Sequence, residues 1–182
     1  MKLTGKVALV TGSSLGIGRA IAERFAQEGA DVVINYNHTL SGAEEALRNI
    51  EAAGHRGFIV KADLANTAEV RNLIASGIEH FEQLDILVNN AGIESHAPFW
   101  EVTEEDYDRV LNVNLKGVFF ATQEIVRHFI ATKRPGKNRQ YQFSPRGPPL
   151  PELCSLLCKQ GWPDVELSGT IETNSKEDTS CM

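Results

Sequence analysis

Three glycines, Gly12, Gly16 and Gly18, stand between a short apolar run and a helical pattern, and this arrangement can hold a pyrophosphate group. Residues 7–10 are apolar with β-branched members, which is typical of a strand buried on both faces. The segment after Gly18 repeats small and apolar residues at helical spacing. Because glycine lacks a Cβ atom, the backbone between the two elements can turn sharply and approach phosphate oxygens. The free N–H groups and the positive end of the helix dipole would then face the anion.

Two further segments follow this turn in a fixed order, an apolar strand pattern that leads into Asp63 and a later tetrapeptide. The turn itself reads T-G-x-x-x-G-x-G from Thr11 to Gly18 and resembles the cofactor loop of the short-chain dehydrogenase/reductase family. The tetrapeptide Asn89-Asn90-Ala91-Gly92 follows a later apolar strand pattern and resembles the second signature of that family. Each segment alone also fits an ordinary turn. The order of all the motifs is specific, so the chain is identified as a member of this family over residues 1–137, similar to its glucose 1-dehydrogenase-like and 3-oxoacyl-acyl-carrier-protein-reductase-like members.

The resemblance implies hydride transfer between a nicotinamide dinucleotide and a carbonyl or alcohol substrate. It also implies the residues that bind the dinucleotide, which are Gly12, Ser14, Leu15, Gly16, Ile17, Gly18, Tyr36, Asp63, Leu64, Asn90, Ala91 and Gly92. In the family, the residue matching Asp63 contacts the adenine ring. The same Asp63 could instead satisfy backbone N–H groups at the end of a strand.

One catalytic position of the family is present at Asn114. The segment Asn112-Val113-Asn114-Leu115 resembles the family segment whose asparagine holds a water in the proton relay, on a helix that is locally kinked. The alternative is a polar side chain satisfied by backbone groups. In the family, the loop before this helix borders the substrate; here it carries Glu94, Ser95 and His96, which an exposed loop explains equally well.

The choice between NAD and NADP depends on the tip of the second strand. A carboxylate there binds the adenosine ribose and favours NAD, whereas a basic neighbour tolerates the 2′-phosphate of NADP. The tip reads Asn35-Tyr36-Asn37-His38 and contains neither. We therefore expect NADP or NAD as the cofactor, with a lean towards NADP; otherwise these polar residues form a solvated loop.

The hydrophobic patterns predict an α/β fold, a Rossmann-type doubly wound parallel sheet with right-handed crossovers that is incomplete at its C-terminal side. The expected strands are Lys6–Val10, Asp31–Tyr36, Phe58–Ala62 and Leu84–Val88. The expected helices are Ile17–Gln27, one from Ser41 to near Gly54, one from Thr67 to His80, and a long one from Thr103, its N-cap, to Ile130.

The resemblance stops after Lys137. The family continues with an apolar strand ending in serine and then a Tyr-x-x-x-Lys motif, in which the tyrosine is the general acid/base. Here Tyr141 is followed four residues later by Pro145, and prolines recur to Pro151. Because proline excludes a central strand, we expect neither strand nor motif from Asn138 onward. We divide the chain into a dinucleotide-binding part, 1–137, and a proline-rich and then polar, disorder-prone tail, 138–182.

A shift of reading frame after Lys137 accounts for this change of composition. Shifted codons permit a peptide with an apolar strand ending in two serines, followed by Tyr-x-x-x-Lys. On this hypothesis the chain lacks the catalytic motif and is a truncated, inactive nucleotide-binding remnant. The alternatives are an unrelated natural C-terminus and a regulatory protein whose tail binds a partner.

Composition and charge limit the classes of molecule that the chain can bind. The chain has 182 residues and a net charge of −6, which argues against nucleic acid and anionic membranes. No signal peptide pattern or long apolar run is present, so we expect a cytoplasmic protein. The three cysteines lie after position 153 without metal-ligand spacing, so we expect no metal site. The family forms homo-oligomers through the long helix; the oligomeric state here is left open.

Overall fold

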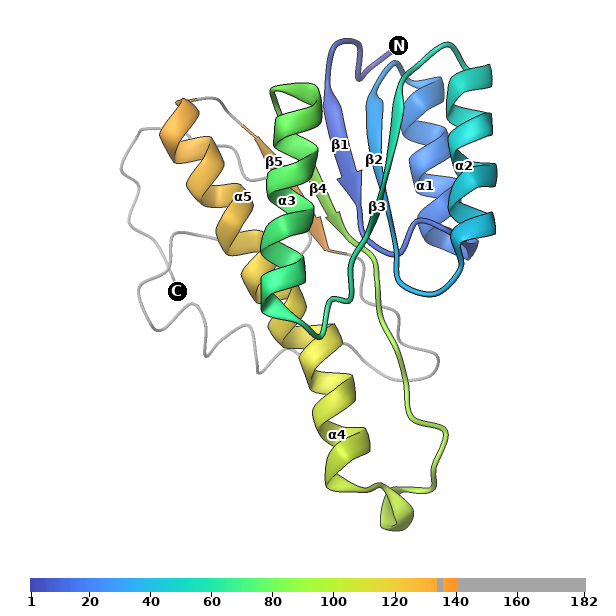
Figure 1. The fold of residues 1–182 in the computed structure, drawn as a ribbon, viewed down its shortest axis with the longest axis vertical. Helices are drawn as coiled ribbons and strands as arrows, with labels where there is room; N and C mark the ends of the chain where they lie inside the picture. Colours follow the sequence, from blue (N-terminus) through green and yellow to red (C-terminus); the bar gives the residue numbers. More distant parts are fainter. Residues whose placement is uncertain (134–135, 141–182) are drawn as a thin grey trace, which may run out of the picture.

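The computed structural model describes residues 1–133 and 136–140, which form one parallel sheet flanked by helices (Figure 1). The described strands lie in the order β3-β2-β1-β4-β5. Their bounds are β1 Val7–Val10, β2 Asp31–Tyr36, β3 Gly57–Lys61, β4 Ile86–Asn89 and β5 Lys137–Gln140. The helices are α1 Gly16–Gln27, α2 Leu40–Ala52, α3 Thr67–Phe81, α4 Glu104–Leu111 and α5 Val118–Thr132, with a 3₁₀ turn η1 at Phe99–Glu101 and a π-helical segment η2 at Asn112–Gly117.

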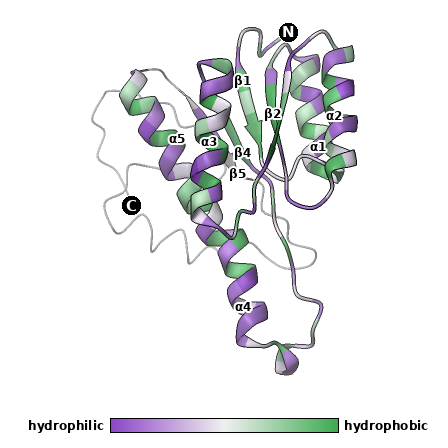
Figure 2. Cartoon of the chain, viewed as in Figure 1, coloured by the Kyte–Doolittle hydropathy of each residue, from purple (hydrophilic) through white to green (hydrophobic). Residues whose placement is uncertain are grey.

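The core consists of two apolar layers, one on each face of the sheet. Along β1, Val7 and Leu9 pack into the layer beneath α3 and α5, while Ala8 and Val10 pack into the layer beneath α1 and α2. All four side chains are buried, as expected for a central strand covered on both faces. Figure 2 shows β1 and β2 as predominantly hydrophobic between the helices. The predicted doubly wound α/β fold is confirmed.

The strand order reverses direction at β1, which has β2 on one side and β4 on the other. The connections that leave the carboxyl ends of β1 and β4 therefore lead to helices on opposite faces of the sheet. In open α/β sheets this switch point is where ligands bind. Here it lies between the glycine turn after β1 and the Asn90-Ala91-Gly92 segment after β4.

The prediction that no strand follows Lys137 is wrong. Residues 137–140 form β5, paired in parallel with β4 from Ile86↔Lys137 to Asn89↔Gln140. The sequence of β5 carries no apolar residue, so the hydrophobic pattern missed it. Backbone pairing does not need apolar side chains, and the buried Asn138 is satisfied by polar neighbours on β4 and α5. The proline-rich segment and the expected disorder of the tail lie outside the described residues.

The long helix predicted from Thr103 is interrupted. Thr103 caps α4, because its Oγ1 accepts the Asp106 N–H at 3.1 Å. After α4 the backbone widens into the π-helical η2 and resumes as α5, so the expected kink is present. Gly117 at the end of η2 has no room for a Cβ atom, which would collide with the carbonyl oxygen of Leu64 after β3.

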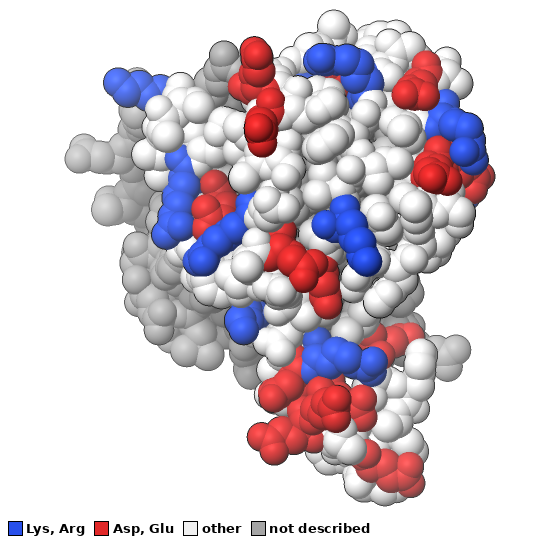
Figure 3. Space-filling view, viewed as in Figure 1, with Lys and Arg blue, Asp and Glu red and all other residues white. Residues whose placement is uncertain are grey.

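The segment from η1 through α4 projects from the body of the molecule as an arm (Figure 1). Phe99 and Trp100 on it are exposed, and acidic side chains gather over α4 (Figure 3). The other helix and strand bounds differ from the predicted ones by only one or two residues, a normal uncertainty for element ends.

Candidate nucleotide-binding site

The turn between β1 and α1 takes the conformation that the glycines allow. Gly12 has φ +62° and Gly16 has φ +54°, both in the left-handed region that favours glycine. Leu15, the N-cap of α1, is extended and makes no side-chain hydrogen bond to the helix. The first N–H groups of α1 thus have no side-chain cap, which is the arrangement that receives an anion at a helix N-terminus.

Gly18 closes this turn against the segment after β4. A Cβ atom at Gly18 would collide with the Gly12 carbonyl oxygen and with Nδ2 of Asn90. The same amide nitrogen donates hydrogen bonds to the carbonyl oxygens of Thr11 at 2.9 Å and Gly12 at 3.3 Å. Two of the sequence signatures, distant along the chain, are therefore in direct contact.

Thr11 is the second link between the two segments, and the sequence analysis did not single it out. Its side chain is 0% exposed. Its Oγ1 accepts the backbone N–H groups of Asn90 at 2.9 Å and Ala91 at 3.0 Å, and its hydroxyl donates to the Val88 carbonyl oxygen at 3.3 Å. The threonine in T-G-x-x-x-G-x-G was the available signal, since a buried hydroxyl needs partners.

The tip of β2 is not uniformly solvated. Asn35 is 2% exposed, and its Oδ1 accepts the Gly12 N–H at 3.0 Å. The solvated-loop interpretation is wrong for this residue, because its amide belongs to the interior of the fold. Tyr36 and Asn37 are half-buried, and Tyr36 is the last residue of β2.

Asp63 and Leu64 follow β3 on the same edge of the sheet. Oδ1 of Asp63 accepts the Ala65 N–H at 2.9 Å, so the structural alternative for this carboxylate is observed. The Asp63 N–H donates to Glu69 Oε2 at 2.8 Å, a contact that the sequence analysis missed. Leu64 is buried in the layer beneath α3 and α5. The adenine contact of Asp63 stays a prediction.

Asn114 lies in η2 and faces the loop after β4. Its Oδ1 accepts the Ile93 N–H at 2.9 Å, and its Nδ2 donates to the Ile93 carbonyl oxygen at 2.7 Å. A Cβ atom at Gly92 would lie 3.5 Å from Asn114 Oδ1. The side chain therefore holds the loop that follows Asn90-Ala91-Gly92. Its predicted role in holding a water stays a prediction.

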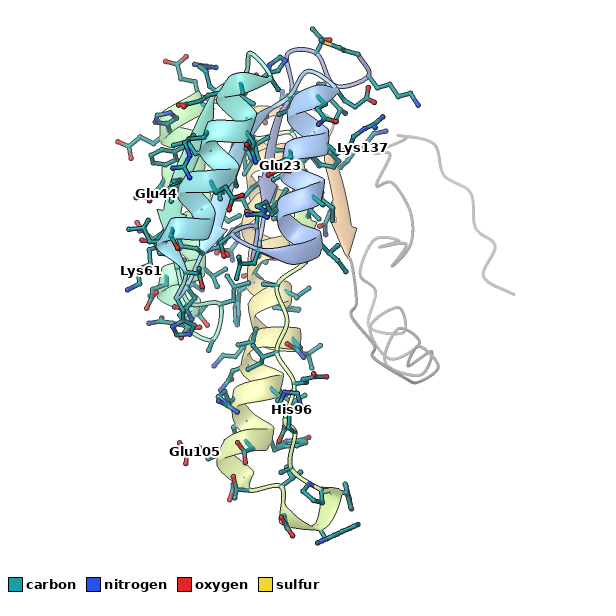
Figure 4. All side chains as sticks on the ribbon, turned by 90° about the vertical axis from the view of Figure 1, so that its right-hand side faces the viewer. Glu23, Glu44, Lys61, His96, Glu105 and Lys137 are labelled. Carbon is teal, nitrogen blue, oxygen red and sulfur yellow. The ribbon has the colours of Figure 1, made fainter. Side chains whose placement is uncertain are left out.

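The residues considered for substrate contact lie on the loop that leads from β4 to the arm. His96 is 86% exposed in its side chain, with Nδ1 3.8 Å from Glu94 Oε1. Figure 4 shows His96 on this loop, between the body of the molecule and Glu105 and far from Lys61 at the end of β3. The described part of the chain thus does not bring His96 to the glycine turn.

Residues 1–133 and 136–140 contain neither a cluster of metal ligands nor a helix that could span a membrane. No three histidine, cysteine, aspartate or glutamate side chains there are grouped so as to hold a metal ion. None of the helices in the same ranges combines the length and the hydrophobicity needed to cross a bilayer.

Known proteins share this architecture. The solved structure of a short chain dehydrogenase from Burkholderia cenocepacia in complex with NADP is 46% identical to this chain, with a TM-score of 0.69, over 70% of this chain and 52% of that one. A blue fluorescent protein from a metagenomic library, solved in complex with NADPH, is 38% identical with a TM-score of 0.70, over 77% and 56%.

Sequence comparison agrees with these structures. The hydroxynaphthalene reductase-like protein Arp2 of Metarhizium robertsii is 48% identical over 126 residues, which are 69% of this chain and 47% of that protein. The chain spans about half the length of the curated relatives it matches. The family model for short chain dehydrogenases matches residues 6–137 and ends where the resemblance was predicted to end. The chain therefore belongs to the short-chain dehydrogenase family.

Proposed function

We propose that residues 1–137 bind a nicotinamide dinucleotide at the switch point, with the pyrophosphate at the N-terminus of α1. The solved relatives described above hold NADP and NADPH, which supports this cofactor class. The residues that would hold it are Gly12, Ser14, Leu15, Gly16, Ile17, Gly18, Tyr36, Asp63, Leu64, Asn90, Ala91 and Gly92.

The contact of Gly18 with Asn90 and Gly12 is the observation that carries this proposal. It holds the backbone of the turn against the segment after β4 and leaves the uncapped end of α1 exposed beside it. Leu15 and Ile17, which flank Gly16 at this end, have exposed side chains, so no packed side chain covers the turn there. A backbone surface that is rigid and rich in N–H groups suits a pyrophosphate.

We propose that the cofactor is NADP, or either dinucleotide without strong preference. The carboxylate that would select NAD by binding the ribose hydroxyl is absent from the residues that end β2 and follow it. Tyr36 is the half-buried last residue of β2. Replacing Tyr36 by aspartate is expected to move the preference towards NAD.

Isothermal titration of Gly18→Ala with NADP⁺ and NAD⁺ tests the binding site. A Cβ atom at position 18 displaces the turn from Asn90, so we expect loss of measurable binding. Gly54→Ala is the control for a glycine-to-alanine substitution that meets no neighbour: Gly54 has φ +85° but open space around its Cβ position, whereas Gly18 has no positive φ and is closely packed. Binding by Gly18→Ala at the wild-type affinity, with Gly54→Ala also unchanged, refutes the assignment of this turn.

We further propose that the chain does not reduce carbonyls. When bound, the nicotinamide of NADPH supplies hydride, and a general acid must then reach the carbonyl oxygen. Tyr141 is the single tyrosine after Asn114 in the 182 residues, and position 145 is proline where the family has lysine. The match to the family model ends at Lys137, just before this segment.

A steady-state assay tests this second proposal. The 182-residue chain and a version with the shifted frame restored after Lys137 are compared on a panel of ketones, quinones and sugars with both cofactors. We expect turnover in the restored version alone. Comparable turnover by the chain with Pro145 in place requires a different proton donor and contradicts the proposal.

A further inference from the structure

Asn35 connects three strands to the glycine turn. Its backbone pairs with the turn, since the Ser13 N–H donates to the Asn35 carbonyl oxygen at 2.9 Å and the Asn35 N–H donates to Ser13 Oγ at 3.0 Å. The Ser13 hydroxyl in turn donates to the Val10 carbonyl oxygen of β1 at 2.7 Å. The turn is thus attached to the ends of both β1 and β2.

The side chain of Asn35 extends this attachment in two directions. Its Oδ1 accepts the Gly12 N–H at 3.0 Å, and its Nδ2 donates to the Ala62 carbonyl oxygen after β3 at 3.2 Å. Longer contacts of Nδ2 reach the carbonyl oxygens of Tyr36 at 3.4 Å and Val60 at 3.5 Å. At 2% exposure, this amide has no room to exchange these partners for water.

A primary amide is needed at this position. It presents an acceptor on one side and a donor on the other, whereas a carboxylate presents acceptors alone and leucine presents neither. Gly12 begins the turn in a left-handed conformation, and its N–H is the group that Asn35 holds. Loss of that acceptor leaves a partly buried donor unpaired at the residue where the turn starts.

We propose that Asn35 is a positioning residue for dinucleotide binding, which fixes the glycine turn in its binding conformation before the cofactor arrives. The proposal rests on the proposed function, because it assumes that this turn receives the pyrophosphate. The proposal also means that the Asn35 side chain does not determine the preference for NAD or NADP, because its amide is already hydrogen-bonded in the interior.

Asn35→Asp tests the proposal through pH, with Asn37→Asp as the matched control. A protonated carboxyl at position 35 can accept the Gly12 N–H and donate to the Ala62 carbonyl oxygen, as the amide does. An ionised one turns a negative charge towards that carbonyl. Burial raises the pKa of such a carboxyl group, so we expect its proton to be lost between about pH 6 and about pH 8.5. The half-buried Asn37 receives the same charge two residues away.

Titration of NADP⁺ into full-length protein at about pH 6 and about pH 8.5 gives the comparison. The turn after β1 has no ionisable side chain, and those nearest along β2 and β3, namely Tyr36, His38, Lys61 and Asp63, are unchanged in both variants. The 2′-phosphate of NADP⁺ also changes its charge with pH, and this change is common to the two variants. Relative to the wild type at the same pH, we expect the affinity of Asn35→Asp to fall about tenfold from the lower to the higher pH, whereas the relative affinity of Asn37→Asp, whose carboxylate is ionised at both values, changes by much less.

A relative affinity of Asn35→Asp that changes no more with pH than that of Asn37→Asp, with Asn35→Asp folded, overturns the proposal. Failure of the wild type to bind both NADP⁺ and NAD⁺ refutes the proposed function instead. If Asn35→Asp does not fold, amide hydrogen exchange in the cofactor-free wild type decides: the proposal expects a protected Gly12 N–H, and exchange at the rate of an open loop contradicts it.

Discussion

Thr11→Val removes the hydroxyl that joins the two signature segments while keeping the shape of the side chain. In the native protein Oγ1 accepts the N–H groups of Asn90 and Ala91. Valine offers neither an acceptor nor the donor that now reaches the Val88 carbonyl oxygen. That carbonyl keeps the Thr11 N–H at 3.0 Å, so the substitution orphans the two backbone donors and leaves Val88 paired.

The expected loss of stability follows from the two backbone N–H groups that lose their acceptor. An unpaired buried donor costs about 1–3 kcal/mol, and the residues that own these N–H groups are half-buried, which places each at the lower end. We therefore expect Thr11→Val to lower the free energy of unfolding by about 2–4 kcal/mol. Thr11→Ser keeps the hydroxyl and loses a methyl group, for which we expect about 1 kcal/mol.

Urea unfolding followed by circular dichroism measures both variants, and NADP⁺ titration of each folded protein measures the site. Thr11→Val is expected to weaken binding as well, because Asn90 and Ala91 lose their anchor. The reasoning is refuted if Thr11→Val lies within about 0.5 kcal/mol of the wild type, the range of an ordinary surface substitution.

Two further predictions concern polar side chains that join elements of the sheet and α5. Asp85→Ala is expected to cost about 1–3 kcal/mol, because Asp85 Oδ2 accepts the Val7 N–H at 2.9 Å. Lys6→Met is expected to cost under about 1 kcal/mol, since Lys6 pairs with the same carboxylate but is 47% exposed; equal costs in urea unfolding contradict this assignment. Thr122→Val is expected to cost about 1–3 kcal/mol more than Thr122→Ser, because Thr122 Oγ1 accepts amide hydrogens from both Asn89 and Asn138; equal melting temperatures of the two variants speak against this cluster.

Apolar patterns predicted most of the fold. Four apolar strand segments and the helices between them have the periodicities expected of an α/β sheet, and glycine and threonine marked the ends of elements correctly. β5 could not be found in this way, because Lys137–Gln140 carries no apolar residue and joins the sheet through backbone pairing with β4. Its buried side chain, Asn138, is stabilised by partners that are distant in the sequence.

The candidate site was predictable as a set of motifs but not as a network. The resemblance named Gly18 and Asn90, and the structure shows that these residues touch. It could not show that Thr11 joins the motifs, or that Asn35 points into the interior instead of towards solvent. Side-chain direction at the end of a strand depends on tertiary neighbours, and one sequence contains no information on them.

Backbone amide chemical shifts during NADP⁺ titration of the 182-residue protein test the central claim most directly. Binding at the switch point predicts large shifts for amides of 12–18 and 90–92, with smaller ones for 63–64, and little change on the arm near Glu105. Large shifts confined to other segments, or no shifts at saturating NADP⁺ and NAD⁺, contradict the claim that this turn and the segment after β4 form a dinucleotide site.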